Sequence, residues 1–314
     1  MSAKYNKVAL IGLGLIGSSM AHAMRRAGLA DTITGHAKSA ASREKALEIG
    51  FIDEACDDPA DAVKDADLIV LCVPVGACTD ITKSIAPHIK EGATLTDVGS
   101  VKGAIVRNLE PLVPKGVHFI PGHPIAGTEH SGPTSGFAEL FDGRWCILTP
   151  LYGADDAAVD KLKSFWQACG SSVEIMTPEH HDLVLAITSH VPHLIAYNIV
   201  GTASDLERVT KSEVVKFSAA GFRDFTRIAA SDPVMWRDIF LNNKEAVLEM
   251  LGRFSEDISA LQKAIRYSDG DALEELFTRT REIRRGIIDA GQETDLPDFG
   301  RTAATPTTNT PDEK

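Results

Sequence analysis

The sequence predicts an α/β protein with two folded parts, a doubly wound parallel sheet followed by an all-helical domain. Two observations carry this prediction. Up to about residue 176, short segments rich in β-branched apolar residues alternate with helical patterns, which is typical of parallel βαβ units. Beyond Pro178 the apolar residues recur with helical periodicity only. We therefore expect a sheet-containing domain over residues 1–176 and a helical domain over residues 177–291.

The first domain contains short apolar segments with the character of buried strands. Helical patterns such as SSMAHAMRRAG and SREKALEIG separate them, so successive strands can lie parallel with the helices on the faces of the sheet. The expected strands are residues 7–12, 32–35, 67–74, 94–99, 118–122 and 144–150.

The second domain is expected to consist of helices without a sheet to cover. Asp232 followed by Pro233 predicts a helix start, because Asp caps free N–H groups and proline suits the first helical position. Apolar helices with few other surfaces to pack on favour pairing with a second copy, so we expect a homodimer formed through this domain. The tail over residues 292–314 is rich in Thr, Pro and charge, and we expect it to be disordered. The expected helices are residues 181–201, 212–230, 233–265 and 272–291.

The composition describes a globular protein and argues against a nucleic-acid-binding surface. Of 314 residues, 44% are apolar and 24% are charged, and the net charge of −12 disfavours binding to phosphate backbones. We find no signal-peptide pattern and no apolar stretch near the roughly 18 residues that a membrane span needs. The five cysteines are scattered without a CxxC pair, which is typical of reduced thiols. We expect a cytoplasmic protein without membrane or nucleic-acid partners.

The segment GLGLIG has the GxGxxG spacing of a dinucleotide-binding loop. It follows an expected strand and opens an expected helix, as the Rossmann fold requires. Gly12 would allow the tight turn, Gly14 the approach of a pyrophosphate, and Gly17 close packing of helix on strand. The alternative is a cluster of glycines that serves packing alone. The expected cofactor-binding residues of the loop are Gly12, Leu13, Gly14, Leu15, Ile16 and Gly17.

The choice between NAD and NADP depends on the end of the second strand. A carboxylate there would bind the ribose 2′-hydroxyl and favour NAD, but Asp31 precedes the strand and so lies at the wrong end. The strand is followed by His36 and Lys38, with Arg43 further along, and by no acid. The sequence therefore favours NADP over NAD weakly. The alternative is that Lys38 and Arg43 are ordinary solvated charges.

In such sheets, ligands bind beyond the carboxyl ends of the strands. Three of these ends carry Val73 and Pro74, then Ser100, then His123 within GHPIAGTEHSG. We expect Val73 and Pro74 to contact the cofactor, and His123 to lie at the tip of a strand that faces the nicotinamide.

At this point the sequence resembles the prephenate/arogenate dehydrogenase family of tyrosine biosynthesis over about residues 6 to 265. The resemblance implies oxidative decarboxylation of a small-molecule cyclohexadienyl carboxylate, from prephenate to 4-hydroxyphenylpyruvate or from arogenate to tyrosine. It is carried by four motifs that follow GLGLIG in order: DVGSVKG (97–103), GHPIAGTEHSG (122–132), SHVPH (189–193) and GFRDFTRIAASDPVMWRDIF (221–240).

The resemblance assigns two catalytic residues. It implies that His123 removes the proton of the substrate 4-hydroxyl, a task that suits a neutral histidine near pH 7. The alternative for a loop histidine is a surface or capping role. Ser100 matches the serine that the family places beside the hydroxyl, although its position before an expected helix also suits an N-cap.

The resemblance also assigns residues that bind the substrate. It implies that Arg227 anchors the ring carboxylate and that His193 meets the substrate side chain. Arg223 would share a helical face with Arg227 if this segment is helical, or it could pair with a neighbouring acid. Trp236 would close the pocket, in its own subunit or its partner's, or lie in the core.

Thr128 and Glu129 match family positions that line the pocket, although Glu129 could equally pair with a lysine. His190, which faces His193 across Pro192, is expected to be structural. These two histidines have no third ligand at metal-binding spacing, so we expect no metal.

Two other functions compete with this interpretation. Another Rossmann dehydrogenase with a helical second domain, of the β-hydroxyacid or imino-acid type, would present a catalytic lysine where this chain has arginines. A non-catalytic NAD(P)-sensing protein would keep the glycines but would not need His123, Ser100 and Arg227 together.

Overall fold

The computed structural model describes residues 3–128, 130–210 and 220–289. By its internal contacts the chain divides into two compact units, Met1–Leu251 and Gly252–Lys314. The expected tail over residues 292–314 lies outside the described residues.

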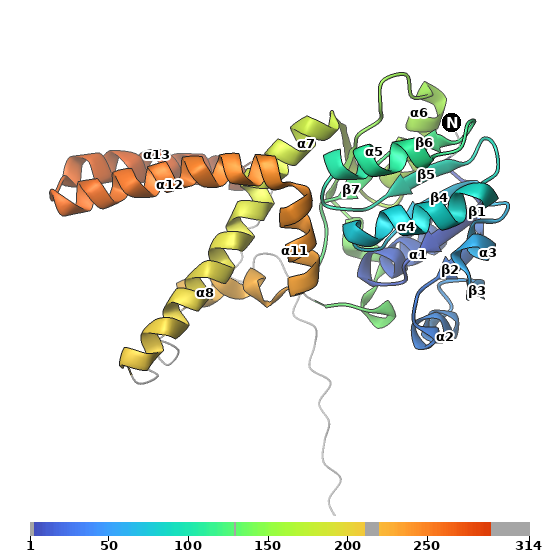
Figure 1. Cartoon of the computed structure of the whole chain (residues 1–314), viewed down its shortest axis with the longest axis horizontal. Helices are drawn as coiled ribbons and strands as arrows, with labels where there is room; N and C mark the ends of the chain where they lie inside the picture. The colour runs from blue at the N-terminus through green and yellow to red at the C-terminus, as the bar shows by residue number, and fades with distance from the viewer. Residues whose placement is uncertain (1–2, 129, 211–219, 290–314) are drawn as a thin grey trace, which may run out of the picture. The chain divides into compact units, whose positions relative to one another are not determined.

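The first unit is built on a six-stranded parallel sheet with the strand order β3-β2-β1-β4-β5-β6 (Figure 1). This is the doubly wound order of a Rossmann fold, so the predicted fold class is confirmed. Its strands are β1 (Tyr5–Ile11), β2 (Ala30–His36), β3 (Glu54–Cys56), β4 (Leu68–Leu71), β5 (Thr94–Asp97) and β6 (His118–Phe119).

Helices cover both faces of this sheet because successive strand residues point to opposite sides. Val8 and Leu10 of β1 lie in one core with α1, α2 and α6, while Ala9 and Ile11 lie in a second core with α3, α4 and α5. The helices are α1 (Leu15–Ala27), α2 (Ala40–Ile49), α3 (Pro59–Val63), α4 (Val75–Ile85), α5 (Gly103–Leu109) and α6 (Asp156–Ala168), with short 3₁₀ turns at Ala86–His88, Glu110–Leu112, Pro133–Ser135 and Ala138–Phe141.

A second, three-stranded sheet contains β7 (Gly122–Pro124), β8 (Trp145–Leu148) and β9 (Ser172–Ile175). The strand β7 runs antiparallel to β8, and β9 runs parallel to it. The single strand predicted over residues 118–122 is therefore wrong, because β6 and β7 belong to different sheets. The strands β3 and β9 were not predicted, since both are short, contain no fully buried residue and lack an apolar run.

The helical part begins at α7 (Pro178–Leu185), which continues through a π-helical turn (Ala186–His190) into α8 (Val191–Thr210). After the undescribed residues 211–219 come α10 (Ala220–Thr226), a 3₁₀ turn (Arg227–Ala230), α11 (Pro233–Asn242), α12 (Lys244–Arg266) and α13 (Gly270–Asp289). The predicted cap of α11 is confirmed, since Asp232 Oδ1 accepts a hydrogen bond from Met235 N at 2.8 Å.

The single helix predicted over residues 233–265 is wrong. It is broken at Asn243, whose backbone (φ −113°, ψ 36°) leaves the helical region. The Asn243 side chain is buried and donates hydrogen bonds to Asp182 O at 2.9 Å and to His190 Nδ1 at 3.0 Å. Apolar periodicity continues through the break, so the sequence pattern gives no sign of it.

The helical segment Pro178–Asp205 is long and apolar enough to cross a membrane by length and composition, with a mean hydropathy of 1.5 in its most apolar window. From the sequence alone we expected no apolar stretch of this length. The same segment contributes His181, Asp182 and His190 to the buried polar contacts described below. Buried polar side chains that hydrogen-bond to other elements of the same chain are typical of a helix packed within a folded protein.

Candidate active site

The glycine-rich loop between β1 and α1 has the close contacts that only glycine permits. Gly12 has φ 111°, and a Cβ atom there would lie 2.3 Å from Cys72 O. A Cβ atom on Gly17 would lie 2.1 Å from Gly12 O, so α1 packs directly on the turn. The turn is held by Gly12 N, which donates to His36 O at 2.8 Å.

Gly14 differs from its two neighbours because a Cβ atom there would meet nothing within 4 Å. Gly14 is the N-cap of α1, and no side chain caps this helix start. The start of α1 therefore has open space at Gly14 and no side-chain cap, and a helix start of this kind can bind a pyrophosphate through its N–H groups and dipole. The loop fits a dinucleotide, with the flanking Leu13 buried and Leu15 and Ile16 half-buried against the core.

The end of β2 carries no carboxylate beside the loop. Asp31 lies at the start of the strand, where it forms an ion pair with Lys4 at 2.5 Å. Arg43 turns back on the segment after β2, donating to Ala37 O and pairing with the Asp57 carboxylate, both at 2.5 Å. This contact argues against Arg43 as a purely solvated charge.

Four other expected cofactor residues lie around the same edge. His36 ends β2, with Nδ1 3.0 Å from Cys56 O, and Lys38 is exposed just beyond it. Val73 follows β4 and packs 3.1 Å from the position of a Gly12 Cβ atom, and Pro74 caps α4.

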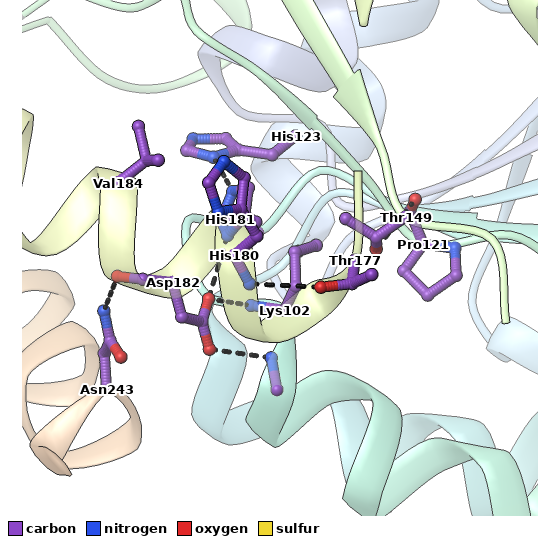
Figure 2. A network of polar contacts seen from close by, with 12 residues as sticks. Lys102, Pro121, His123, Thr149, Thr177, His180, His181, Asp182, Val184 and Asn243 are labelled. Carbon is purple, nitrogen blue, oxygen red and sulfur yellow. Dashed lines mark hydrogen bonds and ion pairs between the residues drawn. The ribbon is translucent and has the colours of Figure 1, made fainter. Parts of the chain in front are cut away.

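His123 lies at the centre of β7 and is 8% exposed. Its Nδ1 atom lies 2.8 Å from Nε2 of His181, a residue of α7 that is 58 positions away in the sequence (Figure 2). Burial lowers the pKa of His123 well below its usual value, and the neighbouring His181, Lys102 and His190 lower it further. The imidazole is therefore neutral at physiological pH and able to accept a proton.

The contact chain continues from His181 to the next residue. His181 Nδ1 lies 2.8 Å from Asp182 Oδ1, and Asp182 also accepts hydrogen bonds from the backbone of Lys102 (2.7 Å) and Gly103 (2.8 Å). Burial lowers the pKa of His181, and the Asp182 carboxylate opposes this effect. Figure 2 shows that Asp182 thereby joins α7 to the start of α5.

A buried ion pair holds the base of β7. Lys102 Nζ contacts the Asp97 carboxylate, and both side chains are fully buried. Lys102 Nζ also donates to Gly122 O at 2.7 Å, and Asp97 Oδ2 accepts from Gly99 N at 2.8 Å. The motif DVGSVKG therefore fixes the backbone directly before His123.

Ser100 is half-buried in this segment, and its N-cap alternative is wrong. The N-cap residue of α5 is Lys102, which forms no side-chain cap, and the helix start is bound by Asp182 instead. The Ser100 backbone lies near the ring of His190, although the buried His190 Nε2 atom makes no hydrogen bond with any described residue. Burial lowers the pKa of His190 to about 4, so this ring is also neutral.

His193 and Trp236 form a stacked pair with ring centroids 3.6 Å apart. His193 Nδ1 lies 2.9 Å from Ser189 O, and Trp236, 6% exposed, packs within its own chain against Val101 and Ile239. Burial lowers the pKa of His193, and the nearby positive charge of Arg227 contributes to this effect. Arg227 thus lies within electrostatic range of His193.

Three other expected residues are not brought into this cluster by any described contact. Arg223 is exposed on α10, and Arg227 begins the 3₁₀ turn that directly follows this helix. Thr128 is exposed, and its Oγ accepts from His130 N at 3.2 Å. Glu129 lies outside the described residues. Among residues 3–128, 130–210 and 220–289 no group of three or more His, Cys, Asp or Glu side chains could hold a metal ion.

Sequence reasoning gave no role to five polar residues of the site. Two of them lie inside the motif DVGSVKG, so their position next to Ser100 was a usable signal. The other three make contacts across 53 to 80 positions, which no local pattern predicts. The five residues are Asp97, Lys102, His181, Asp182 and Asn243.

Residues 20–175 match the family model for the prephenate dehydrogenase nucleotide-binding domain, and residues 177–279 match that for the prephenate dehydrogenase dimerization domain. The chain is 41% identical to a cyclohexadienyl dehydrogenase of Zymomonas mobilis over 90% of this chain and 96% of the relative.

Two solved structures are also similar to this chain. A prephenate dehydrogenase from Aquifex aeolicus in complex with hydroxyphenyl propionate and NAD⁺ superposes with a TM-score of 0.84 at 37% identity, covering 90% of this chain and 98% of that one. An arogenate dehydrogenase from Synechocystis gives a TM-score of 0.76 at 28% identity, covering 89% of this chain and 99% of the other.

Proposed function

Because this chain belongs to the prephenate dehydrogenase family, we propose that it oxidatively decarboxylates prephenate, arogenate or both, with NAD(P)⁺ as the oxidant. Prephenate would give 4-hydroxyphenylpyruvate and arogenate would give tyrosine. The observation that carries the proposal is His123, a buried neutral imidazole at the centre of β7. This strand follows the carboxyl end of β6, the side of the parallel sheet where such folds bind their ligands.

In the proposed mechanism His123 acts as the general base. It removes the proton of the substrate 4-hydroxyl as the carbon that bears it loses a hydride. The para carboxylate leaves as carbon dioxide, and the proton returns from His123 to the phenolate oxygen of the product. The bound oxidised nicotinamide supplies the hydride acceptor. Aromatisation of the ring drives the reaction, so the protein has to orient the ring and hold one proton. Ser100 would bind the same hydroxyl.

The cations and rings of the helical part would bind the rest of the substrate. Arg227 offers two parallel N–H donors to the ring carboxylate, and its closeness to His193 supports a shared ligand. His193, held by Ser189 O and stacked on Trp236, would meet the substrate side chain. Three further residues would line the pocket: Arg223, Thr128 and Glu129.

The cofactor is NAD or NADP, with a weak preference for NADP. The loop of Gly12, Gly14 and Gly17 would hold the pyrophosphate. The end of β2 itself carries no acid, and Lys38 is exposed beside this position. Parallel kinetics with the two cofactors measure the preference.

We also propose a cytoplasmic homodimer without nucleic-acid or membrane partners. The matched dimerization domain and the apolar side chains that the helices expose support the dimer. The net charge of −12 supports the absence of a nucleic-acid partner.

Steady-state kinetics with prephenate and arogenate, each with NAD⁺ and NADP⁺, test the function. His123→Asn should bind the cofactor normally but lose about 10²- to 10⁴-fold in kcat. Unchanged turnover in this variant would remove His123 from the mechanism. Turnover of 3-hydroxyisobutyrate alone would favour the β-hydroxyacid alternative, and cofactor binding without any turnover would favour a sensing protein.

Arg227→Ala separates binding from chemistry in the same assay. Loss of a charge-assisted contact to the ring carboxylate should raise KM by about tenfold or more, with a smaller change in kcat. Arg281→Ala is the matched control, because it removes an exposed arginine of α13 that is not among the expected substrate-binding residues. An unaltered KM in Arg227→Ala would contradict the binding role.

A further inference from the structure

The hydrogen bonds around Asp182 determine which atom of His181 carries a proton. The two carboxylate oxygens of Asp182 already accept from Lys102 N (2.7 Å) and Gly103 N (2.8 Å). An ionised carboxylate only accepts hydrogen bonds, so its third partner, His181 Nδ1 at 2.8 Å, has to be a donor. In a neutral imidazole the other nitrogen, Nε2, is then an acceptor.

The contact with His181 also determines which nitrogen of His123 carries a proton. Its Nδ1 atom lies 2.8 Å from His181 Nε2, and two facing nitrogens bond only if one donates and the other accepts. Because His181 Nε2 accepts, His123 Nδ1 carries the proton. The reverse arrangement needs a doubly protonated His181, which its complete burial opposes.

We infer that His181 and Asp182 are positioning residues that hold His123 in its Nδ1–H tautomer and so leave Nε2 as the basic atom. This inference rests on the proposed function, because it gives His181 and Asp182 a part in the same reaction. When Nε2 takes the substrate proton, the resulting imidazolium keeps its Nδ1–H bond to His181. The second histidine and the carboxylate then stabilise the positive charge that develops on the first.

Asp182 also contacts two other elements of the site. Its carboxylate binds the start of α5, just after Ser100, and its carbonyl accepts from Asn243 at the break between α11 and α12. The acceptor that orients the two histidines is therefore fixed from two other elements, and it needs no movement during the reaction.

The tautomer is measured directly by ¹⁵N NMR of the full-length protein with labelled histidine, and the His123→Asn spectrum assigns the His123 signals. The wild-type protein should show a protonated Nδ1 and a bare Nε2 at neutral pH. A protonated Nε2 on His123 would overturn the inference without the need for any further variant.

A matched pair of variants tests the role of His181. His181→Phe fills the space but offers no acceptor, so the His123 signals should lose the Nδ1–H preference and kcat should fall by about tenfold or more. In His181→Gln the amide oxygen can accept from His123 while its N–H₂ group donates to Asp182. We expect this variant to keep the tautomer and to recover part of kcat.

The outcomes separate this inference from the proposed function. If His123→Asn loses turnover while His181→Phe keeps the wild-type tautomer and kcat, the positioning role fails alone. If His181→Phe changes the tautomer while His123→Asn retains turnover, the proposed catalytic role of His123 fails instead. Equal loss of kcat in His181→Gln and His181→Phe, with the tautomer retained in both, indicates only a structural role and also overturns the inference.

Discussion

Lys102 places a fully buried positive charge between the end of β5 and the start of β7. Its ammonium group contacts the Asp97 carboxylate and donates to Gly122 O, one residue before His123. A buried ion pair contributes little net stability, but removal of one partner leaves the other charge uncompensated. The pair therefore makes the backbone under His123 intolerant of single substitutions.

We predict that Lys102→Met lowers the free energy of unfolding by about 3–5 kcal/mol, because Asp97 stays buried without its partner. The double variant with Asp97→Asn should recover part of this loss. Lys90→Met is the matched control, since the pair of Lys90 with Asp67 is partly exposed (39% and 24%) and should cost about 1 kcal/mol or less. Urea denaturation measures all three, and equal losses in the two single variants would contradict the prediction.

At the residue scale, the sequence contained local patterns for the glycine-rich loop and for the strand ends, but not the contacts that orient His123. Gly12, Gly14 and Ser100 were predictable because loop spacing and strand ends are local patterns. His181 and Asp182 directly follow a helix start and have no unusual spacing, so only the folded chain brings them to His123. Their roles follow from contacts across 58 and 80 residues.

At the scale of elements, α1 begins at a loop in which two glycines serve different purposes. A methyl group on Gly17 would meet Gly12 O at 2.1 Å, whereas one on Gly14 would meet nothing within 4 Å. Gly17 is thus required by the fold, whereas no contact within the described chain requires a glycine at position 14.

We predict that Gly14→Ala keeps the wild-type melting temperature but weakens cofactor binding by at least about tenfold, a cost near 1.4 kcal/mol. Its methyl group would stand where the pyrophosphate approaches. Gly17→Ala should lower the melting temperature instead, because α1 has to move away from the turn. Thermal unfolding with and without cofactor, together with titration calorimetry, separates the two. Normal cofactor affinity in a stable Gly14→Ala protein would show that the dinucleotide does not pass there.

The break between α11 and α12 shows what periodicity cannot predict. Apolar residues continue at helical spacing on both sides of Asn243, so the pattern indicated a single helix. The break follows from a polar requirement, since Asn243 uses both amide hydrogens for Asp182 O and His190 Nδ1. The sequence also indicated one strand where the structure has β6 and β7. Only two residues separate these two strands, which belong to different sheets.

At the scale of the whole molecule, the buried histidines link stability to pH. Burial lowers the pKa values of His123, His181, His190 and His193, that of His190 to about 4. In the unfolded chain these groups titrate near their usual value of about 6.5. Below that pH the unfolded state binds more protons than the folded state, so the free energy of unfolding decreases as the pH falls. Above about pH 6.5 the stability that these neutral histidines contribute is fully present.

We predict that the free energy of unfolding drops between pH 7.5 and 5.5, and that His190, whose pKa is about 4 in the folded protein, contributes about 1 kcal/mol of this loss. Urea denaturation at the two pH values measures the difference. In His123→Asn the difference should be smaller, because one titrating group is removed. An equal stability at both pH values would mean that these rings are not held neutral in the folded protein.

The helices matched to a dimerization domain expose apolar side chains that a lone chain would leave in water. Leu241 of α11 is 68% exposed and Leu248 of α12 is 55% exposed. Such exposure costs about 25 cal/mol for each Å² of apolar surface, so a second copy that covers these residues would be stabilised.

We predict that the wild-type protein elutes at twice its chain mass of 33.7 kDa and that Leu241→Asp combined with Leu248→Asp shifts it to the monomer. Charged groups in the contact would have to be desolvated without partners. Leu47→Asp is the matched control, since Leu47 is an apolar residue 43% exposed on α2, outside the matched dimerization domain. Light scattering coupled to size-exclusion chromatography reports the mass. Because unfolding would also disrupt a dimer, the charged double variant has to retain its helical circular dichroism; a folded double variant that stays dimeric would place the contact elsewhere.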